Sequence, residues 1–407
     1  MSEISANILR MWKYKFRKRF AHSAKQPAVA LISTTMENGG KEQVMLDLYH
    51  GYKKRGIRAY IVCQNWTIDA VKDLIDAPED IFVFENDLQS LIHFLWRRDV
   101  RNLHYHYNTF GMEELKEIGF RIIYTMHNTY TWLNDDEIRA YAGVLSHVDT
   151  VVPVSKSVQE YFCIRSGCDG SNFKVIKNGV DFTILDNQEQ KLPYSRESIG
   201  LKKGDISIGF VSSFYHAKAQ IAILGVAEKI VLKYPYAKFL FLGSKGDESY
   251  YNRFLEELEI CAAKDNIVLA PAIPHSQMGR FYREMIDIFI CPTLHEGGPL
   301  VAVEAMYCGL PIIMTPTGIA EDLAQEAACL ICAAAYDDIR TVTDDEIKNK
   351  MSLVKHGKNE DSIVACLSEM IDHLPEYQKR ARECIRNCEN YSIDAMVDAY
   401  VDLLCIT

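Results

Sequence analysis

Short apolar runs alternate with longer amphipathic stretches through the first half of the chain. The runs span residues 28–33, 58–63, 81–84, 103–105, 121–125 and 150–154. Buried strands separated by helices are typical of a parallel sheet that is covered by helices on both faces. The pattern therefore predicts a doubly wound α/β domain in this half of the chain.

The alternation breaks between Asp186 and Gly204, where the sequence is polar and charged, as in a linker. A second series of apolar runs follows, at residues 206–211, 238–242, 267–269, 287–291, 312–314 and 329–332. A chain of 407 residues is also too long for one ordinary core. We therefore expect a second doubly wound domain. Ligands of such sheets bind at the carboxyl ends of the strands, which favours a site in a cleft between the domains.

The C-terminal segment predicts one more helix. Ser392 can cap it, and its apolar positions recur at helical spacing at Ile393, Met396, Val397, Tyr400 and Leu404. The expected limits are an N-terminal segment at 1–26, a first domain at 27–190, a linker at 191–204, a second domain at 205–388 and this C-terminal helix at 389–407.

Residues 287–311 carry the clearest chemical signal. An apolar run leads into a loop with Gly297-Gly298, and Pro299 suits the first position of a helix because it lacks an N–H group. A glycine-rich loop before a helix presents backbone N–H groups and a positive dipole end, which bind phosphate. Glu296 lies in that loop and Glu304 in the helix. An anion site flanked by two carboxylates suits a nucleotide-sugar, which combines phosphates with hydroxyl groups.

The spacing of Glu296 and Glu304 resembles the E-x7-E element of retaining GT-B glycosyltransferases, in particular glycosyltransferase family 4. Further segments occur in the family's order, namely Asn38-Gly39-Gly40, Thr125-Met126-His127-Asn128, Val154-Ser155-Lys156-Ser157, Asn178-Gly179-Val180-Asp181 and Thr315-Pro316-Thr317-Gly318. The resemblance implies two Rossmann-like domains that face a cleft, with the C-terminal helix crossing back to the N-terminal domain. It also implies retaining transfer of a sugar from a nucleotide diphosphate to a glycan or lipid-linked saccharide, in cell-surface polysaccharide or glycolipid synthesis.

The resemblance places the donor on the second domain. It implies that Glu304 accepts hydrogen bonds from ribose hydroxyls and that Glu296 contacts the donor sugar. The helix that carries Glu304 is apolar on most faces, so this carboxylate is expected to be buried and to need partners. Backbone N–H groups would hold the diphosphate, and they belong to Gly297, Gly298, Leu300 and Val301, since proline has none.

Lys218 follows the first strand of the second domain, as the family's donor lysine does, and would stabilise the diphosphate as a leaving group. The family usually has an arginine five residues earlier, where this chain has Ser213. Arginine holds phosphate in two-pronged fashion and serine cannot. Three alternatives stay open: a shifted register, another cation (His216 or Lys245), or weak donor turnover.

Two motifs of the first domain resemble donor-contacting elements. By resemblance, His127 contacts the donor sugar near the reacting centre. Gly39 and Gly40 would let the backbone approach the donor phosphate or the acceptor closely. The alternatives are that His127 has a structural role and that Gly39 and Gly40 form a plain tight turn. His104 and His106 are weaker candidates, and one of them resembles a packing histidine of the family.

No D-x-D element occurs, so we expect a metal-independent transfer without a cofactor beyond the nucleotide-sugar, a UDP-sugar being favoured. The helix N-terminus and Lys218 would supply the positive charge that a metal supplies elsewhere. No side-chain nucleophile stands out, which favours front-face substitution with the leaving phosphate as base. The expected catalytic residues are His127, Lys218 and Glu296. Cys329 and Cys332 have C-x-x-C spacing, but with no second pair they are expected to pack in the core.

The net charge of -10 argues against a nucleic-acid partner, which needs a basic face. The chain shows neither a membrane-spanning apolar run nor a signal-peptide core, which predicts a cytoplasmic protein. Residues 1–26 are basic, and an aromatic and aliphatic stripe recurs every four residues at Ile4, Ile8, Trp12, Phe16 and Phe20. As a helix, this segment could bind an anionic membrane on its inner face or pack on the first domain. Both alternatives stay open, as does a floppy tail.

Two rival functions also stay open. Because Ser213 replaces the family's arginine, the chain could be a catalytically weak or dead relative that acts as a binding scaffold, which nucleotide binding would test. A nucleotide-sugar epimerase of the GT-B type is the second rival, although Glu296 and Glu304 argue against it, and product analysis would decide. The sequence leaves the donor sugar, the base, the acceptor and the oligomeric state open. Acceptor contacts are expected in loops around 108–114 and 130–137.

Overall fold

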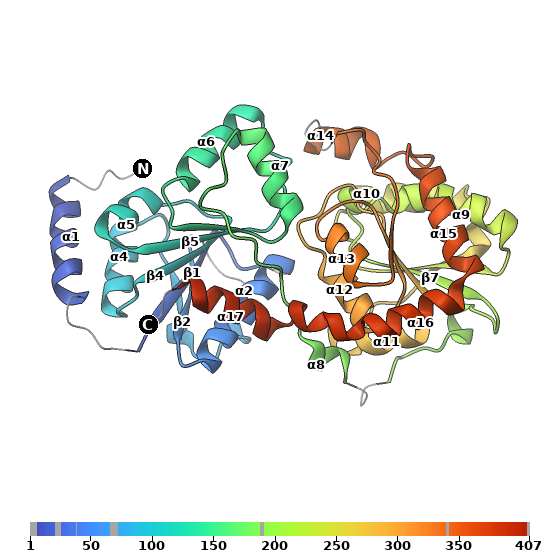
Figure 1. The fold of residues 1–407 in the computed structure, drawn as a ribbon, viewed down its shortest axis with the longest axis horizontal. Helices are drawn as coiled ribbons and strands as arrows, with labels where there is room; N and C mark the ends of the chain where they lie inside the picture. Colours follow the sequence, from blue (N-terminus) through green and yellow to red (C-terminus); the bar gives the residue numbers. More distant parts are fainter. Residues whose placement is uncertain are drawn as a thin grey trace. The chain divides into compact units, whose positions relative to one another are not determined.

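The computed structural model describes residues 6–20, 26–37, 39–65, 72–187, 191–338 and 342–404, and these fold into two compact units (Figure 1). The first unit takes the described residues of Met1–Asn128, Asp135–Gly179 and Ile393–Thr407. The second unit takes those of Thr129–Asn134 and Val180–Ser392. Two units, each with its own sheet, agree with the two series of apolar runs.

The first unit contains a six-stranded parallel sheet in the order β3-β2-β1-β4-β5-β6. Its strands are β1 (Ala28–Ser33), β2 (Arg58–Cys63), β3 (Ile81–Val83), β4 (Asn102–His106), β5 (Arg121–Met126) and β6 (Thr150–Pro153). In the central strand β1 every residue is buried, as expected for a strand covered on both faces. The strand order reverses between β1 and β4, so this sheet has its switch point there.

The helices of the first unit alternate with these strands. They are α1 (Ala6–Phe20), α2 (Gly40–Lys54), η1 (Pro78–Asp80), α4 (Leu88–Arg97), α5 (Met112–Ile118), α6 (Asp135–Leu145), α7 (Lys156–Ser166) and α17 (Ile393–Leu403). Side-chain caps begin two of them. Asp87 accepts hydrogen bonds from the N–H groups of Gln89 and Ser90 before α4, and Ser155 accepts one from Val158 before α7.

Helix α1 packs on the first unit through the aromatic stripe of the sequence (Figure 1). Trp12 and Phe16 are buried, Trp12 in edge contact with His93 and Trp96, and Phe16 against Phe120. Two of the stripe residues therefore face the protein, as in the packing alternative. Ile4 and the side chain of Phe20 lie outside the described part of the chain.

Helix α17 is the last described helix, and it packs on α2 of the first unit although the residues before it belong to the second (Figure 1). Val397 lies so close to Gly51 that a Cβ there would overlap it. The Tyr400 hydroxyl is 2.8 Å from the Thr125 hydroxyl in β5. The prediction that the C-terminal helix returns to the N-terminal domain is confirmed.

The second unit repeats the same topology, with a parallel sheet in the order β12-β11-β10-β7-β8-β9. Its strands are β7 (Ile206–Val211), β8 (Ala237–Leu242), β9 (Ile267–Leu269), β10 (Ile288–Cys291), β11 (Ile312–Met314) and β12 (Cys329–Ile331). Strands β7 and β10 pair in parallel, with Ile208 opposite Ile288. The switch point of this sheet lies between them.

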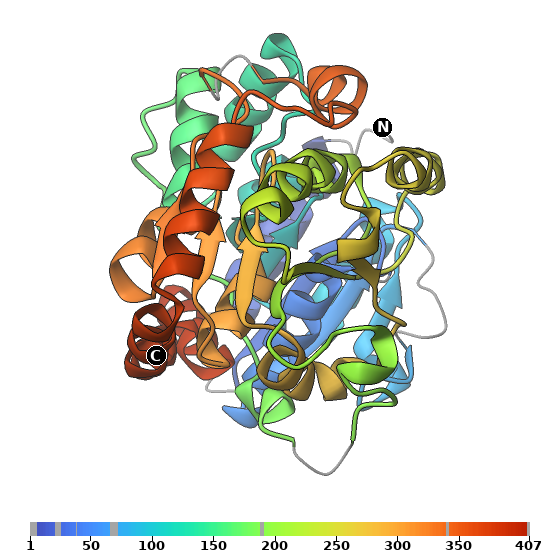
Figure 2. The same cartoon turned by 90° about the vertical axis from the view of Figure 1, so that its right-hand side faces the viewer.

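Helices cover both faces of this second sheet (Figure 2). One face packs against α9 (Gln220–Lys233), α10 (Glu248–Glu259) and α15 (Glu360–Asp372), and the other against α11 (Met278–Met285), α12 (Leu300–Tyr307) and α13 (Ala320–Glu326). Successive residues of one strand face opposite cores, as Phe241 and Leu242 do. The remaining short elements are α8 (Phe182–Leu185), η2 (Glu197–Ile199), η3 (His216–Lys218), η4 (Lys264–Asn266), η5 (His275–Gln277), α14 (Asp344–Glu346), η7 (Ile347–Met351), α16 (Leu374–Cys384) and η8 (Ile385–Tyr391).

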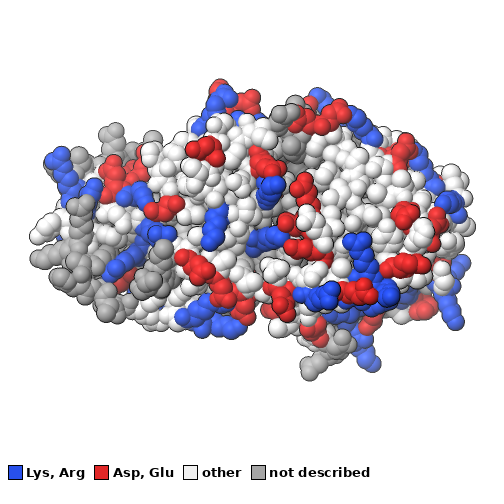
Figure 3. Space-filling model, in the orientation of Figure 1, with Lys and Arg blue, Asp and Glu red and all other residues white. Residues whose placement is uncertain are grey.

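Acidic and basic side chains are interspersed on the face drawn in Figure 3, with no broad field of one sign. Among the described helices, none combines the length and the apolar character that crossing a membrane requires.

Candidate active site

The switch point of the second sheet holds an ion pair between two residues of the predicted site. Lys218 ends η3, which follows β7, and Glu296 lies in the loop after β10. The Lys218 Nζ donates a hydrogen bond to Glu296 Oε1. Burial alone would lower the pKa of Lys218, but the charge of Glu296 and this hydrogen bond outweigh it and raise the pKa. Lys218 is therefore an ammonium ion at neutral pH, and it lies where ligands of such sheets bind.

The loop between Glu296 and α12 presents unpaired backbone donors. Helix α12 begins at Leu300, and Pro299 is its N-cap residue, one position before the place that the sequence predicted. Among the described residues, no acceptor binds the N–H groups of Gly297, Gly298, Leu300 or Val301. The first N–H groups of a helix carry partial positive charge. These donors and Lys218 are thus the groups of the second unit that an anion would use.

A second loop packs against the loop that precedes α12, which is called the donor loop here because of its backbone hydrogen-bond donors. Gly318 has φ of 57°, and a Cβ there would lie 2.9 Å from Pro299 Cδ and 3.1 Å from the Gly297 carbonyl oxygen. The Thr315 hydroxyl donates to the Thr293 carbonyl oxygen at 2.6 Å. The segment Thr315–Gly318 therefore has a physical role, because only glycine allows both this backbone conformation and this close packing.

Glu304 is buried in α12, with 6% of its surface exposed, and both carboxylate oxygens have partners. The Tyr282 hydroxyl of α11 donates to Oε2 at 2.8 Å, and His275 Nε2 lies 3.1 Å from Oε1. Burial and the nearby Glu304 charge raise the pKa of Tyr282 well above its usual value, so this hydroxyl keeps its proton. Each carboxylate oxygen has a second lone pair and can accept a further hydrogen bond.

Ser213 lies in the loop after β7. The backbone oxygen of Ser213 accepts a hydrogen bond from Gln220 Nε2 at 2.9 Å. Of the two alternative cations, His216 is buried and its Nε2 lies 3.3 Å from Asp344 Oδ1. Burial lowers the pKa of His216 despite this carboxylate. Lys245 is exposed, with its Nζ 5.3 Å from the centre of the Tyr251 ring, and is the better placed of the two to meet a ligand from solvent.

The glycine loop of the first unit leads into α2 after β1. Asn38 lies outside the described residues, whereas Gly39 and Gly40 are described. Gly39 has an extended backbone with φ of -173°, and a Cβ on Gly40 would meet no atom within 4 Å. Neither position needs glycine for its backbone conformation, and the space above Gly40 is open.

Lys41 follows these glycines and is a site candidate that the sequence interpretation missed. Its Nζ donates to the Ser33 hydroxyl at 2.8 Å and to the Thr35 carbonyl oxygen at 2.9 Å, and pairs with Glu42 at 2.8 Å. Lysines are frequent and no spacing pattern marks this one. Only the fold reveals that its ammonium group, carried by α2, lies at the end of β1.

His127, which is half-buried, follows β5 and lies in line with two buried histidines of β4. His127 Nε2 lies 2.8 Å from His106 Nδ1, and the ring of His104 lies near that of His106, with centroids 4.2 Å apart. Burial and the charge of Lys41 lower the pKa of His127 to about 3, and burial lowers that of His104 to about 3. The pKa of His106 also falls well below its usual value through burial. All three are neutral at pH 7, so His127 can donate or accept a hydrogen bond but cannot neutralise a phosphate.

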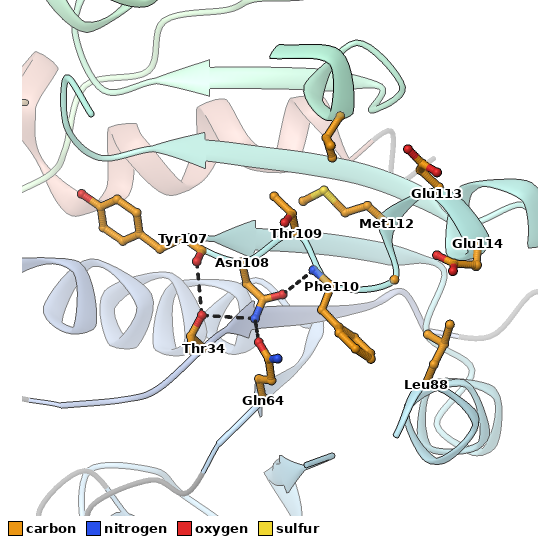
Figure 4. Close-up of a pocket in the computed structure, with 12 residues that line it drawn as sticks. Thr34, Gln64, Leu88, Tyr107, Asn108, Thr109, Phe110, Met112, Glu113 and Glu114 are labelled. Carbon is orange, nitrogen blue, oxygen red and sulfur yellow. Dashed lines mark hydrogen bonds between the residues drawn. The ribbon is translucent and has the colours of Figure 1, made fainter. Parts of the chain in front are cut away.

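A cavity of about 600 Å³ opens at the switch point of the first sheet (Figure 4). It is lined by the ends of β1, β2 and β4 and by the start of α5, through Thr34, Gln64, Leu88, Tyr107, Asn108, Thr109, Phe110, Gly111, Met112, Glu113, Glu114 and Val144. These residues include the loop at 108–114 where acceptor contacts were expected.

The structure thus brings Lys218, Glu296 and the donor loop together in the second unit, while Gly39, Gly40 and His127 lie in the first. The partners of Glu304 came from α11 and η5, more than twenty positions away, where no motif marks them. Cys329 and Cys332 are buried in the core, and the described residues contain no group of three side chains suited to a metal ion.

Two family descriptions match the chain in sequence. "Glycosyl transferases group 1" matches residues 193–360, and "Glycosyltransferase Family 4" matches residues 38–183. A phosphatidylinositol N-acetylglucosaminyltransferase of Arabidopsis thaliana is 22% identical over 58% of this chain, and a D-inositol 3-phosphate glycosyltransferase of Segniliparus rotundus is 21% identical over 56%. The chain spans about half the length of these curated relatives, 53% in each case.

The fold also matches solved structures. HepE of Anabaena, crystallised in complex with UDP, superimposes with a TM-score of 0.72 over 93% of this chain and 99% of its own, at 14% identity. At that identity the likeness concerns the fold. Taken together, the two matched halves and the paired Rossmann-like units show that the chain belongs to glycosyltransferase family 4 and has the GT-B fold.

Proposed function

We propose that the protein transfers a sugar from a nucleotide diphosphate donor to a hydroxyl group of a saccharide acceptor, with UDP as the favoured nucleotide. The observation that carries the proposal is the anion-binding arrangement of the second unit. Lys218 and four unpaired N–H groups surround the end of β10, next to a buried carboxylate. The fold match to a protein crystallised with UDP supports the choice of nucleotide.

Each group of the second unit has a role in this proposal. The N–H groups of Gly297, Gly298, Leu300 and Val301 bind the diphosphate, and Glu304 accepts hydrogen bonds from the ribose. Lys218 leaves Glu296 in part to pair with the diphosphate, which is the more highly charged partner, and Glu296 then accepts hydrogen bonds from the sugar. As the bond between the sugar and the phosphate breaks, Lys218 stabilises the negative charge on the leaving oxygen.

The proposed reaction is metal-independent and retains the anomeric configuration. The acceptor oxygen attacks the anomeric carbon from the face that the phosphate leaves, through an oxocarbenium-like transition state. The acceptor's proton passes to the departing phosphate oxygen, so no side-chain base is needed. His127, which is neutral, contributes a hydrogen bond to the donor sugar rather than a charge.

The acceptor in this proposal is a glycan or lipid-linked saccharide, as in the synthesis of a cell-surface polysaccharide or glycolipid. Its site is the cavity of the first unit, which is large enough for a sugar residue and lies at the switch point of the sheet. Two of the curated relatives are named for acceptors that contain inositol together with phosphate, so their names support a hydroxyl-rich acceptor but do not speak for one without phosphate.

We further propose a cytoplasmic protein that attaches to the inner face of a membrane through charge. In α1 the aromatic residues Trp12 and Phe16 are buried, whereas Arg10, Lys13 and Lys15 are exposed. Binding to vesicles with anionic lipid should therefore weaken steeply between about 50 mM and about 500 mM salt, as expected for charge pairing. A triple change of these three residues to glutamate should abolish sedimentation with the vesicles, and sedimentation equal to wild type would exclude the attachment.

Calorimetric binding of UDP, GDP and ADP tests the donor site. We expect one nucleotide to bind, and Glu304→Ala to weaken it at least tenfold, or about 1.4 kcal/mol. Glu284→Ala is the matched control, because Glu284 pairs with Arg280 on the exposed side of α11. Binding of none of the three nucleotides would reject the proposed function.

A binding scaffold without turnover is the second candidate, and the missing arginine at Ser213 favours it. The cations nearest in sequence do not replace that arginine in bidentate geometry, since His216 faces Asp344. Ser213→Arg separates the two candidates. Under the proposed function, the wild-type protein and the variant both hydrolyse or transfer the donor sugar, whereas a scaffold shows neither activity until arginine is restored.

A further inference from the structure

The cavity of the first unit is built on a fixed loop. The Thr34 hydroxyl donates to the Tyr107 carbonyl oxygen at 3.2 Å, and Tyr107 has φ of 50°, a left-handed conformation that few non-glycine residues adopt. Asn108 is buried, and its Oδ1 accepts from the Phe110 N–H at 2.8 Å while its Nδ2 donates to Gln64 Oε1 at 2.6 Å (Figure 4). These bonds hold the wall of the cavity in one shape before any ligand arrives.

The same bonds occupy the amides of the lining, so other groups remain for a ligand. Those are the Thr109 hydroxyl and the carboxylates of Glu113 and Glu114, beside an apolar wall that includes Phe110 and Met112. Figure 4 shows both carboxylates at the same end of the cavity. No hydrogen bond or ion pair of the described residues involves either carboxylate.

The lining contains two carboxylates and neither lysine nor arginine. Lys41 lies on the same edge of the sheet, but Ser33, Thr35 and Glu42 surround its ammonium group. A phosphate in the cavity would therefore face two like charges with no cation among the lining residues to offset them. Hydroxyl groups and protonated amines, by contrast, donate hydrogen bonds to carboxylates, and those of a charged donor are the stronger.

We propose that this cavity takes a saccharide unit that carries no phosphate, and that it prefers one with a protonated amine, held by Glu113 and Glu114. The inference rests on the proposed function, because it names the acceptor class of the same reaction. First-turn glutamates also stabilise a helix by complementing its dipole. Only Glu113 and Glu114 line the cavity, however, whereas Glu117 on the same helix does not.

The test compares the binding of three probes that differ in one substituent, by ligand-observed NMR titration at pH 7. The probes are methyl glucosaminide, methyl glucoside and methyl glucoside 6-phosphate. In the wild-type protein we expect the amine to bind at least fivefold tighter than the neutral sugar, and the phosphate to bind at least fivefold weaker. The double variant Glu113→Gln, Glu114→Gln should reduce both ratios below twofold, and Glu117→Gln should leave them unchanged.

Each outcome decides the inference. A phosphate probe that binds as tightly as the neutral sugar overturns it, as do ratios that the double variant leaves unchanged or that Glu117→Gln reduces equally. Absence of binding by all three probes at roughly 20 mM, a concentration that would detect a binding free energy of only about 2 kcal/mol, also overturns it. UDP titration of the same samples separates the two proposals. A protein that binds UDP but ranks the sugars otherwise keeps the donor site and loses this inference, and the reverse result keeps the cavity and rejects the donor site.

Discussion

The two sheets of this protein have the same strand order, yet the loops at their switch points present different polar groups. In the second unit, Lys218 and four unpaired N–H groups converge on the end of β10, which suits an anion. In the first unit, the cavity is lined by Glu113 and Glu114, and Lys41 is already enclosed by acceptors. Under the two proposals, one repeated scaffold would bind a diphosphate at one switch point and an uncharged or cationic group at the other. The difference shows that the loops, and not the strand order, determine what each sheet binds.

The largest effect is expected when a substitution removes the cation from the switch point of the second sheet. Lys218→Met should lower kcat/KM for the donor by about 10²–10³, because a preorganised charge at the leaving group is lost. Lys233→Met is the matched control, since that exposed lysine at the end of α9 pairs with Asp372, and it should change kcat/KM less than about threefold. Lys41→Met makes the comparison between the units. A loss as large as that of Lys218→Met would place the diphosphate on the first unit and break the contrast.

A pair of glycine substitutions, one in each unit, tests how closely the backbone packs in the loops that follow the strands. A Cβ on Gly243 would overlap the carbonyl oxygen of Ser212, whereas one on Gly40 meets open space. Gly243→Ala should destabilise the second unit by roughly 2–3 kcal/mol, and Gly40→Ala should be neutral or stabilising by up to about 1 kcal/mol. Differential scanning calorimetry measures both. Equal shifts in the transition temperature would contradict the difference in space.

Acid should weaken the first unit more than the second. Burial lowers the pKa of His104 and of His127 to about 3 and that of His106 well below its usual value, while the second switch point has His295 with a pKa lowered to about 4. Below a pH of about 6.5 the histidines of the unfolded chain bind protons, whereas these folded imidazoles do not. The free energy of unfolding therefore decreases as the pH is lowered. Well below pH 6.5, the slope is about 1.4 kcal/mol per pH unit for each histidine.

Thermal unfolding between pH 7.5 and pH 5, followed by separate probes of the two units, measures this effect. His106→Phe, which removes one of the titrating rings, should flatten the dependence of the first unit and leave that of the second unchanged. A first unit whose transition temperature is independent of pH would show that the imidazoles titrate normally.

The smallest expected effect concerns the support of Glu304. Tyr282→Phe removes the hydroxyl that donates to Oε2 and should weaken UDP binding about threefold to tenfold, since a single hydrogen bond contributes roughly 1 kcal/mol. Tyr250→Phe is the control, because that buried hydroxyl bonds to the Ile221 N–H in α9. If Tyr282→Phe binds UDP as wild type does, Glu304 is held by packing and His275 alone.

The amino-acid sequence by itself determined the two doubly wound domains and the existence of the C-terminal helix, because apolar periodicity depends on local burial that each element carries in its own residues. The return of that helix to the first domain was implied by the family resemblance and not by periodicity. It also marked Glu296 and Glu304, whose spacing is set within one loop and one helix. The hypothesis of an aromatic membrane face at the N-terminus fared differently. Periodicity predicts an apolar stripe but not its partner, and the fold turns Trp12 and Phe16 onto the first unit.

Only the tertiary structure decided which distant side chains meet. Tyr282 and His275 reach Glu304, His106 reaches His127, and Asn108 shapes the cavity, although nothing in their sequence spacing indicates these contacts. The physical reason is that parallel strands bring their carboxyl ends to one edge regardless of the length of chain between them. A contact at that edge depends on strand order and register, which are properties of the folded sheet and not of any one segment.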